Sequence, residues 1–248
     1  MSFTVHKYRD VKWSRPIAIV GFPSIGLSSS IAANFLARTL ELEILGGISS
    51  PEFPPYAVIQ NGIPMPPVRL YGGDRNCDTG DGVECDGLMV VTSEFLPKIE
   101  QHQPLAVSLM DWFSANGVKI VICLEGIPQF GPDDTGIVGA GSTPSANAIM
   151  DKYSIERLED SLVRGTTGVM LYEGRMRGMD VMAVLSPSRT DMPDPRGAAK
   201  LMEPLTKMFP ELKIDIEPLY KDAEELEKRM VPPGGMAGAG NDKSFLYG

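Results

Sequence analysis

Short apolar runs, separated by stretches with helical spacing of apolar residues, recur along most of the chain. The runs at 15–22 (RPIAIVGF), 87–93 (GLMVVTS) and 118–126 (VKIVICLEG) are nearly continuous, which is typical of strands buried on both faces. The run at 180–188 (DVMAVLSPS) also has strand character. We therefore expect these four segments to be strands of one sheet.

Helical patterns alternate with these strands. They predict helices over 25–40, 104–116, 145–153 and 166–178, and apolar residues fall on one face of the first two. Strands that alternate with helices of about 10–15 residues form βαβ units. The sequence therefore predicts an α/β fold with a mostly parallel, mixed sheet covered by helices on both faces.

Proline punctuates the region between the first helix and the strand at 87–93. The segments 44–50 and 56–62 are β-like, and prolines separate them. The segment 66–73 (PPVRLYGG) is a further predicted strand, and its prolines indicate a position at the edge of the sheet. Residues 131–144 have the composition of a loop.

Two helices are predicted near the C-terminus. Asp194 is a good N-cap and Pro195 suits the first helical position, whereas Pro204 should kink or split this helix. The helix at 217–230 carries a narrow apolar stripe, which packs on its own domain in the favoured interpretation and on another subunit in the alternative. The stripe consists of Leu219, Ala223, Leu226 and Met230.

The chain is expected to divide into a single α/β domain, residues 1–231, and a flexible tail, residues 232–248. The tail begins with two prolines and is rich in glycine and alanine, a composition that predicts disorder through about Lys243. It ends in an apolar tip, Phe245-Leu246-Tyr247-Gly248.

The charge balance limits the classes of partner. The net charge is −9 and the pI is about 4.8, which argues against binding to nucleic acid or to an anionic membrane. No apolar run approaches the roughly 20 residues of a membrane span, and the N-terminus lacks the apolar core of a signal peptide. Three cysteines are too few for a disulfide framework, so we expect a reducing, cytoplasmic environment.

The segment GFPSIGLS (21–28) has the glycine spacing of a phosphate-binding loop. Leu27, however, stands where such a loop carries its lysine. A tight structural turn is therefore favoured over nucleotide binding, and no cofactor is predicted.

An acidic segment at 72–87 contains five carboxylates and two cysteines. Carboxylates suit hard cations whereas thiolates suit zinc, and the spacing matches no standard calcium or zinc motif. We favour a solvated polar loop over a metal site. The residues concerned are Asp74, Cys77, Asp78, Asp81, Glu84, Cys85 and Asp86.

A small-molecule enzyme, either a hydrolase or an ATP-dependent ligase, is the rival interpretation. Glu94 and Glu125 follow predicted parallel strands, where open α/β sheets bind ligands. The other candidates for such a site are Ser24, Ser93, His102 and Cys123. No nucleophile-elbow motif accompanies them, so we assign no catalytic residue.

The tripeptide Leu246-Tyr247-Gly248 is more informative. A tether that ends in an aromatic residue and a carboxylate is suited to reach a pocket on a partner, since tyrosine supplies amphipathic area and the carboxylate can pair with a lysine. The alternative is that the tip folds back on its own domain.

Several segments together resemble the archaeal branch of the proteasome assembly chaperone family. The resemblance covers about residues 15–230, and its parts occur in the family's order. They include PIAIVGFPSIGLSSSIAANFLA, PEFPPYAVIQNG, LMVVTSEFLP, VKIVICLEGIP, RGTTGVMLYEGRMRGMDVMAVLSPS and PDPRGAAKLMEPLTKMFPELKIDIEPL.

This resemblance implies a three-layer α/β/α domain of the phosphorylase/hydrolase-like type that forms homo-oligomers and has no catalytic residues. Some members end in a hydrophobic-tyrosine-any motif that enters a pocket between α-subunits of the proteasome core particle. Leu246, Tyr247 and Gly248 match that motif. The resemblance therefore implies binding to the core particle through these residues and Phe245.

Overall fold

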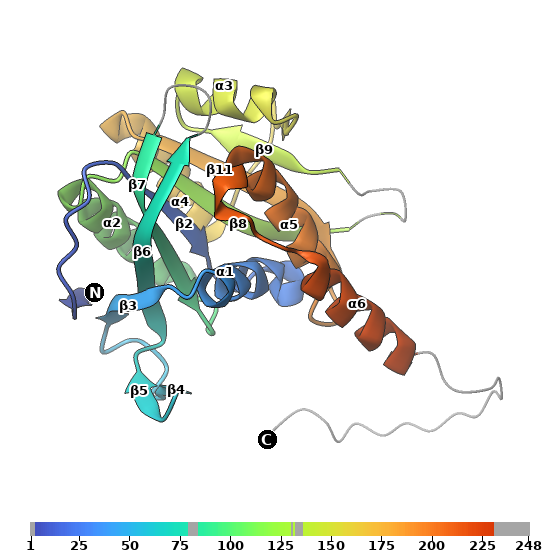
Figure 1. Ribbon diagram of the computed structural model, residues 1–248, viewed down its shortest axis with the longest axis horizontal. Coiled ribbons are helices and arrows are strands. Elements are labelled where there is room, and N and C mark those ends of the chain that lie inside the picture. The colour runs from blue at the N-terminus through green and yellow to red at the C-terminus, as the bar shows by residue number, and fades with distance from the viewer. Residues whose placement is uncertain (1–2, 79–83, 130, 132–135, 231–248) are drawn as a thin grey trace.

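The computed structural model describes residues 3–78, 84–129, 131 and 136–230 (Figure 1). The strands are β1 (Thr4–Lys7), β2 (Pro16–Gly21), β3 (Glu43–Ser49), β4 (Val58–Gln60), β5 (Ile63–Met65), β6 (Val68–Asp78), β7 (Glu84–Ser93), β8 (Ile120–Pro128), β9 (Val138–Gly141), β10 (Glu156–Arg157) and β11 (Asp180–Ser188). The α-helices are α1 (Ser28–Thr39), α2 (Ile99–Ala115), α3 (Pro144–Lys152), α4 (Gly165–Arg177), α5 (Pro195–Met208) and α6 (Glu217–Met230).

Nine of the described strands form one sheet in the order β1-β3-β6-β7-β2-β8-β11-β9-β10. The strands β7, β2, β8 and β11 at its centre are parallel, and antiparallel pairs flank them on both sides. These four are the apolar runs of the sequence, and every residue of β2 is buried. The predicted α/β fold with a mixed sheet is confirmed.

Helices cover both faces of the sheet (Figure 1). On one face, Leu36 of α1, Ile149 of α3 and Met202 of α5 belong to one apolar core, which α6 also joins. On the other face, Leu109 of α2 and Met170 of α4 belong to a second core. The predicted three layers are therefore present. No helix in the described ranges has the length and apolarity needed to cross a membrane.

Helix α5 begins where the sequence predicts, but Pro204 does not split it. The Asp194 carboxylate accepts a hydrogen bond of 2.9 Å from Gly197 N, and Pro195 is the first helical residue. α5 continues through Pro204, which is buried, to Met208. Of the two predicted outcomes, a kink or a split, the split is wrong, because packing against α1 and α6 holds α5 in place despite the missing N–H.

The proline-rich region differs from the prediction. β6 lies between β3 and β7 rather than at an edge, because Pro66 and Pro67 precede its first residue, Val68, and interrupt no ladder. The segment 56–62 supplies β4, which pairs with β5 in a separate hairpin. β9 lies in a region that the sequence assigned to a loop, since its small residues, VGAG, give no apolar run.

Candidate functional site

The partner-binding residues predicted from the sequence, Phe245, Leu246, Tyr247 and Gly248, lie outside the described residues. The described part ends at Met230, the last residue of α6. The structure therefore shows the helix that precedes the tail, and the motif itself stays a prediction.

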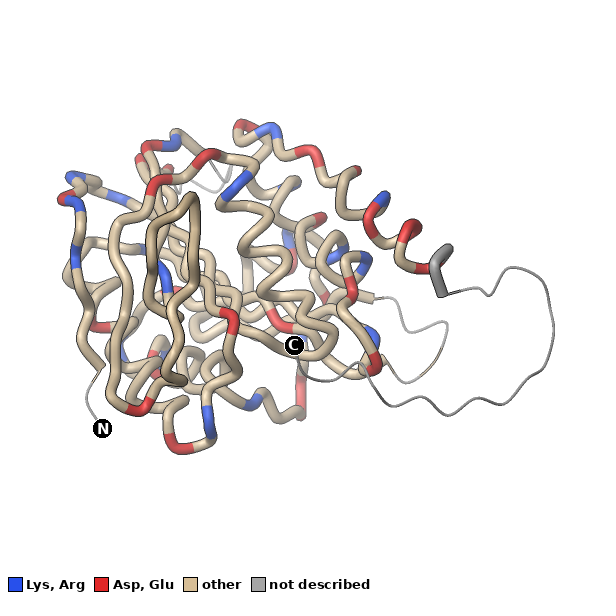
Figure 2. Tube along the Cα trace, turned by 90° about the horizontal axis from the view of Figure 1, so that it is seen from below, with Lys and Arg blue, Asp and Glu red and all other residues tan. Residues whose placement is uncertain are grey.

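α6 is fixed to the domain by apolar and charged contacts. Leu219 and Ala223 of the predicted stripe are buried, and Leu219 belongs to the core that includes α5. Arg196 of α5 makes two hydrogen bonds of 3.1 Å with the carboxylate of Glu227. Acidic residues predominate along this helix (Figure 2). The favoured interpretation, packing on its own domain, is confirmed for the first half of the stripe.

The segment 21–28 forms a turn against which other segments of the domain pack closely. Gly26 adopts φ 63°, and Asp194 N donates a hydrogen bond of 2.7 Å to its carbonyl. A Cβ at Gly26 would collide with the side chain of Asp194. Ser24 Oγ accepts from Gly126 N at 2.8 Å. The position where a phosphate would lie is thus covered by the segment that precedes α5, in agreement with a tight structural turn.

The residues proposed for a hydrolase do not form a nucleophile and base pair. His102 Nδ1 is bonded to Thr166 Oγ1 at 2.9 Å, and Ser93 bonds only to the backbone of its own turn. Cys123 is fully buried beside Met170, and burial raises the pKa of its thiol. The described contacts therefore give no group that would activate either nucleophile.

Glu125 has an unusual environment at the carboxyl end of β8. Its carboxylate accepts a hydrogen bond of 2.8 Å from Thr167, in the first turn of α4. Burial raises the pKa of Glu125 to about 7, although the hydrogen bond from Thr167 opposes this effect. Thr166 beside it holds His102, whose pKa burial lowers. Burial thus favours the neutral form of both side chains, which are hydrogen-bonded to consecutive threonines.

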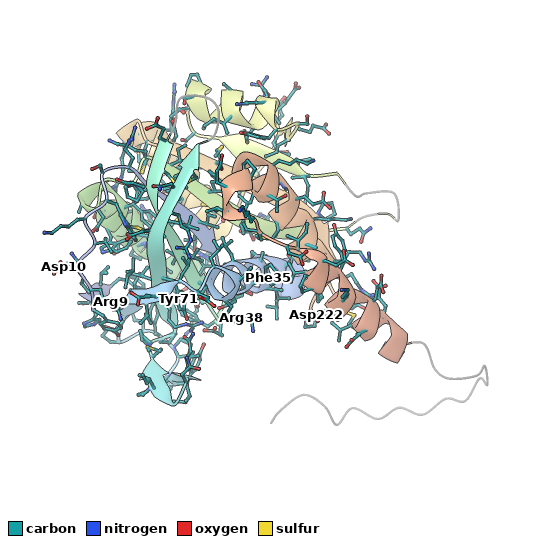
Figure 3. All side chains as sticks on the ribbon, viewed as in Figure 1. Arg9, Asp10, Phe35, Arg38, Tyr71 and Asp222 are labelled. Carbon is teal, nitrogen blue, oxygen red and sulfur yellow. A yellow bond between two sulfur atoms is a disulfide. The ribbon has the colours of Figure 1, made fainter. Side chains whose placement is uncertain are left out.

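Glu94, itself 40% exposed, pairs with the buried Arg69, a contact that the sequence did not indicate. The Arg69 guanidinium holds both oxygens of Glu94, and its Nε donates to Tyr71 Oη at 2.9 Å. Tyr71 Oη in turn donates to Gln60 Oε1 of β4 at 2.6 Å, so the chain of bonds fixes the β4–β5 hairpin. Tyr71 and Arg38 of α1 line a cavity of about 210 Å³ beside this hairpin (Figure 3). The only sequence signal is an arginine within an apolar strand.

The acidic segment at 72–87 is mostly a paired ribbon, which corrects the expectation of a solvated loop. β6 and β7 pair as far as Asp78 and Glu84, and only residues 79–83 lie outside the described part. Cys77 and Cys85 face each other across the ribbon and form a disulfide. This disulfide was not expected from the cysteine count, which therefore gives no support for a reducing environment.

The carboxylates of this ribbon are engaged with the N-terminal segment. Asp74 accepts from Trp13 Nε1 at 2.6 Å, and Asp86 accepts from the backbone N–H of Ser14 and Arg15. Among the described residues, no three potential metal ligands gather. Asp81 lies outside the described residues. The ribbon thus serves to hold the segment that precedes β2.

Comparison with known proteins decides the family. A model described as the PAC2 family matches residues 18–231. The chain belongs to the PAC2 family. A curated relative, an uncharacterized protein of Methanocaldococcus jannaschii, is 30% identical over 220 residues, which cover 89% of this chain and 86% of the relative.

Solved structures extend this comparison. The chain is similar to Pyrococcus furiosus PbaA, described as an archaeal homolog of proteasome-assembly chaperone, with 28% identity, a TM-score of 0.78 and coverage of 92% of this chain and 95% of that one. It shares its fold with Pyrococcus furiosus PbaB, described as an archaeal proteasome activator, at 22% identity, a TM-score of 0.76 and coverage of 92% and 97%. The resemblance seen in the sequence is confirmed at the level of the family.

Proposed function

We propose that this protein binds the α-subunits of the proteasome core particle through Leu246, Tyr247 and Gly248, with Phe245 adding apolar area beside them. It acts there as an assembly chaperone or as an activator. The similarity to PbaA over 92% of the chain carries the proposal. The match of the last residues to the hydrophobic-tyrosine-any motif supplies the proposed contact.

The proposal assigns no catalytic role to the domain. Its support is the arrangement at the carboxyl ends of the central strands, where Ser24, Glu94 and Glu125 bond to other protein groups.

We further propose that the protein is a cytoplasmic homo-oligomer and that residues 232–248 are flexible tails on it. Each tail would bind weakly, and several tails on one particle raise the effective concentration at the α-ring. The helix that precedes the tail, α6, is held on the domain by the Arg196–Glu227 pair, which supports a fixed starting point for each tail.

The motif is tested by a matched set of variants in a pull-down with archaeal core particles. Tyr247→Ala removes the ring and should abolish binding, whereas Tyr247→Phe keeps the ring and should retain most of it. One residue added after Gly248 displaces the carboxylate and should also abolish binding. If binding survives both Tyr247→Ala and the added residue, docking through the tail is wrong.

A further inference from the structure

Residues of β9, the strand that lies below α3 in the view of Figure 1, line two adjoining cavities. Their volumes are about 450 and 320 Å³, and both are lined by Ala140, Gly141 and Asn147. The first extends to Tyr172 and Arg175 of α4, and the second extends to residues 157–159 at the end of β10. We call the two cavities together the β9 groove.

The register of the sheet leaves part of β9 without a neighbour on the groove side. Ser142 N donates to Val181 O of β11 at 2.9 Å, whereas Leu158 N on the other side donates to Gly139 O at 2.8 Å. Backbone groups alternate in direction along a strand, so Gly141 points to the same side as Gly139. The pairing of β10 with β9 covers only positions 138 and 139 of β9. The N–H and C=O of Gly141 therefore face the groove.

The residues of β9 are small (VGAG) because neighbouring elements pack closely against them. A Cβ at Gly141 would lie 2.5 Å from Asn147 Oδ1 of α3, and Gly141 itself stays partly exposed. Unpaired strand edges are templates for another strand, and proteins usually protect them with charges or proline. The free end of β9 has neither within its own residues.

Side chains around the groove favour an acidic ligand at its first cavity. Tyr172 is 43% exposed and offers a ring for an apolar contact. Arg175 is exposed and takes part in none of the ion pairs among the described residues, whereas Arg177 of the same helix pairs with Asp111 and Glu173. The N-terminus of α3, capped by Thr143, also borders this cavity, but Asp180 accepts a hydrogen bond from Thr143 Oγ1 and offsets the partial positive charge of the helix, so Arg175 is the charge that faces a ligand there. A negatively charged residue, Glu159, lines the second cavity.

We propose that the β9 groove binds an extended acidic peptide segment of a partner protein, which adds a strand to the free edge of β9. The backbone of the segment bonds to Gly141, an apolar side chain lies on Tyr172, and a carboxylate pairs with Arg175. This is recognition by strand addition, in which main-chain bonds supply affinity and side-chain contacts supply specificity. The site is separate from the C-terminal motif and does not require the core particle.

The test uses the full-length protein and two fluorescent heptapeptides with blocked ends. Both alternate threonine and valine, and the central residue is glutamate in one and lysine in the other. The glutamate peptide should bind saturably, measured by fluorescence anisotropy, and the lysine peptide should bind at least about tenfold more weakly. In an NMR spectrum of the labelled protein, the Gly141 amide should shift on binding.

Matched variants separate the groove from general electrostatics. Arg175→Glu should lower the affinity for the glutamate peptide by about tenfold or more. Arg38→Glu, at an exposed arginine of α1 outside the groove, should leave this affinity unchanged. A glutamate peptide with alternate N-methyl groups cannot add a strand and should not bind. Absence of saturable binding by the glutamate peptide overturns the proposal. The proposal is also overturned if the N-methylated peptide binds as tightly as the unmethylated one, or if both arginine variants lose the same affinity for the glutamate peptide.

Discussion

Replacement of the Glu125 carboxyl by an amide tests the environment that the structure assigns to this residue. Glu125→Gln keeps the shape of the side chain and its ability to accept the hydrogen bond from Thr167. It removes the ionisation. Because burial raises the pKa of Glu125 from 4.5 to about 7, the folded state favours the neutral carboxyl. The contribution of this group to the free energy of unfolding is fully present below about pH 4.5 and is lost as the pH rises through 7.

The magnitude follows from the shift. Each pKa unit corresponds to about 1.4 kcal/mol, so ionised Glu125 costs the folded protein on the order of 3 kcal/mol. The residue keeps partial solvent exposure, which reduces this cost. We therefore expect the free energy of unfolding of Glu125→Gln, measured relative to the wild type, to increase by about 2 kcal/mol between about pH 5 and pH 8.

Urea unfolding at both pH values measures this difference. His102, whose pKa burial lowers, adds a pH dependence of its own, but it is present in both proteins and cancels in the comparison. Glu211→Gln, at an exposed carboxylate, is the control and should leave the pH dependence unchanged. A difference between Glu125→Gln and the wild type that stays constant with pH would show that Glu125 is not in a desolvated site.

Three further perturbations test the remaining structural assignments. Cys85→Ser removes the bond to Cys77 and should lower the free energy of unfolding by about 2–3 kcal/mol in urea titrations, and a reductant should lower the wild type to the same level but leave the variant unchanged. Arg69→Met removes the partner of the partly exposed Glu94 and the donor to Tyr71, and should cost about 1–2 kcal/mol by thermal unfolding; an unchanged melting temperature would mean that these contacts add no stability. Gly126→Ala places a methyl group against the backbone of the turn before α1 and should cost about 1–3 kcal/mol, so a neutral effect in calorimetry would contradict the close packing there.

Much of the fold was predictable because the central strands are buried on both faces. β2, β7, β8 and β11 are continuous apolar runs, and helical spacing between them specifies the layers. The errors fall where local signals are weak or misleading. Pro66 and Pro67 precede β6 rather than lie within it, and Pro204 lies in a helix that its neighbours hold. β9 has no bulky residues, so it lacks the pattern of a strand.

The candidate site was less predictable, because its features depend on which residues meet across the fold. Nothing in the sequence near Arg69 identifies Glu94 as its partner, and the disulfide depends on the register of β6 with β7. The same holds for the β9 groove, where the free edge follows from the short length of β10. By contrast, the hydrophobic-tyrosine-any motif can be recognised in the sequence alone, and its role stays a prediction.

A native binding assay with archaeal core particles tests the central claim most directly. The full-length protein is compared with a form that lacks Leu246, Tyr247 and Gly248, and circular dichroism checks that both are folded. We predict that the full-length protein shifts the core particle on a native gel and that the truncated form does not. Equal binding by both forms would contradict docking through the tail, and absence of binding by both would contradict the proposed partner itself.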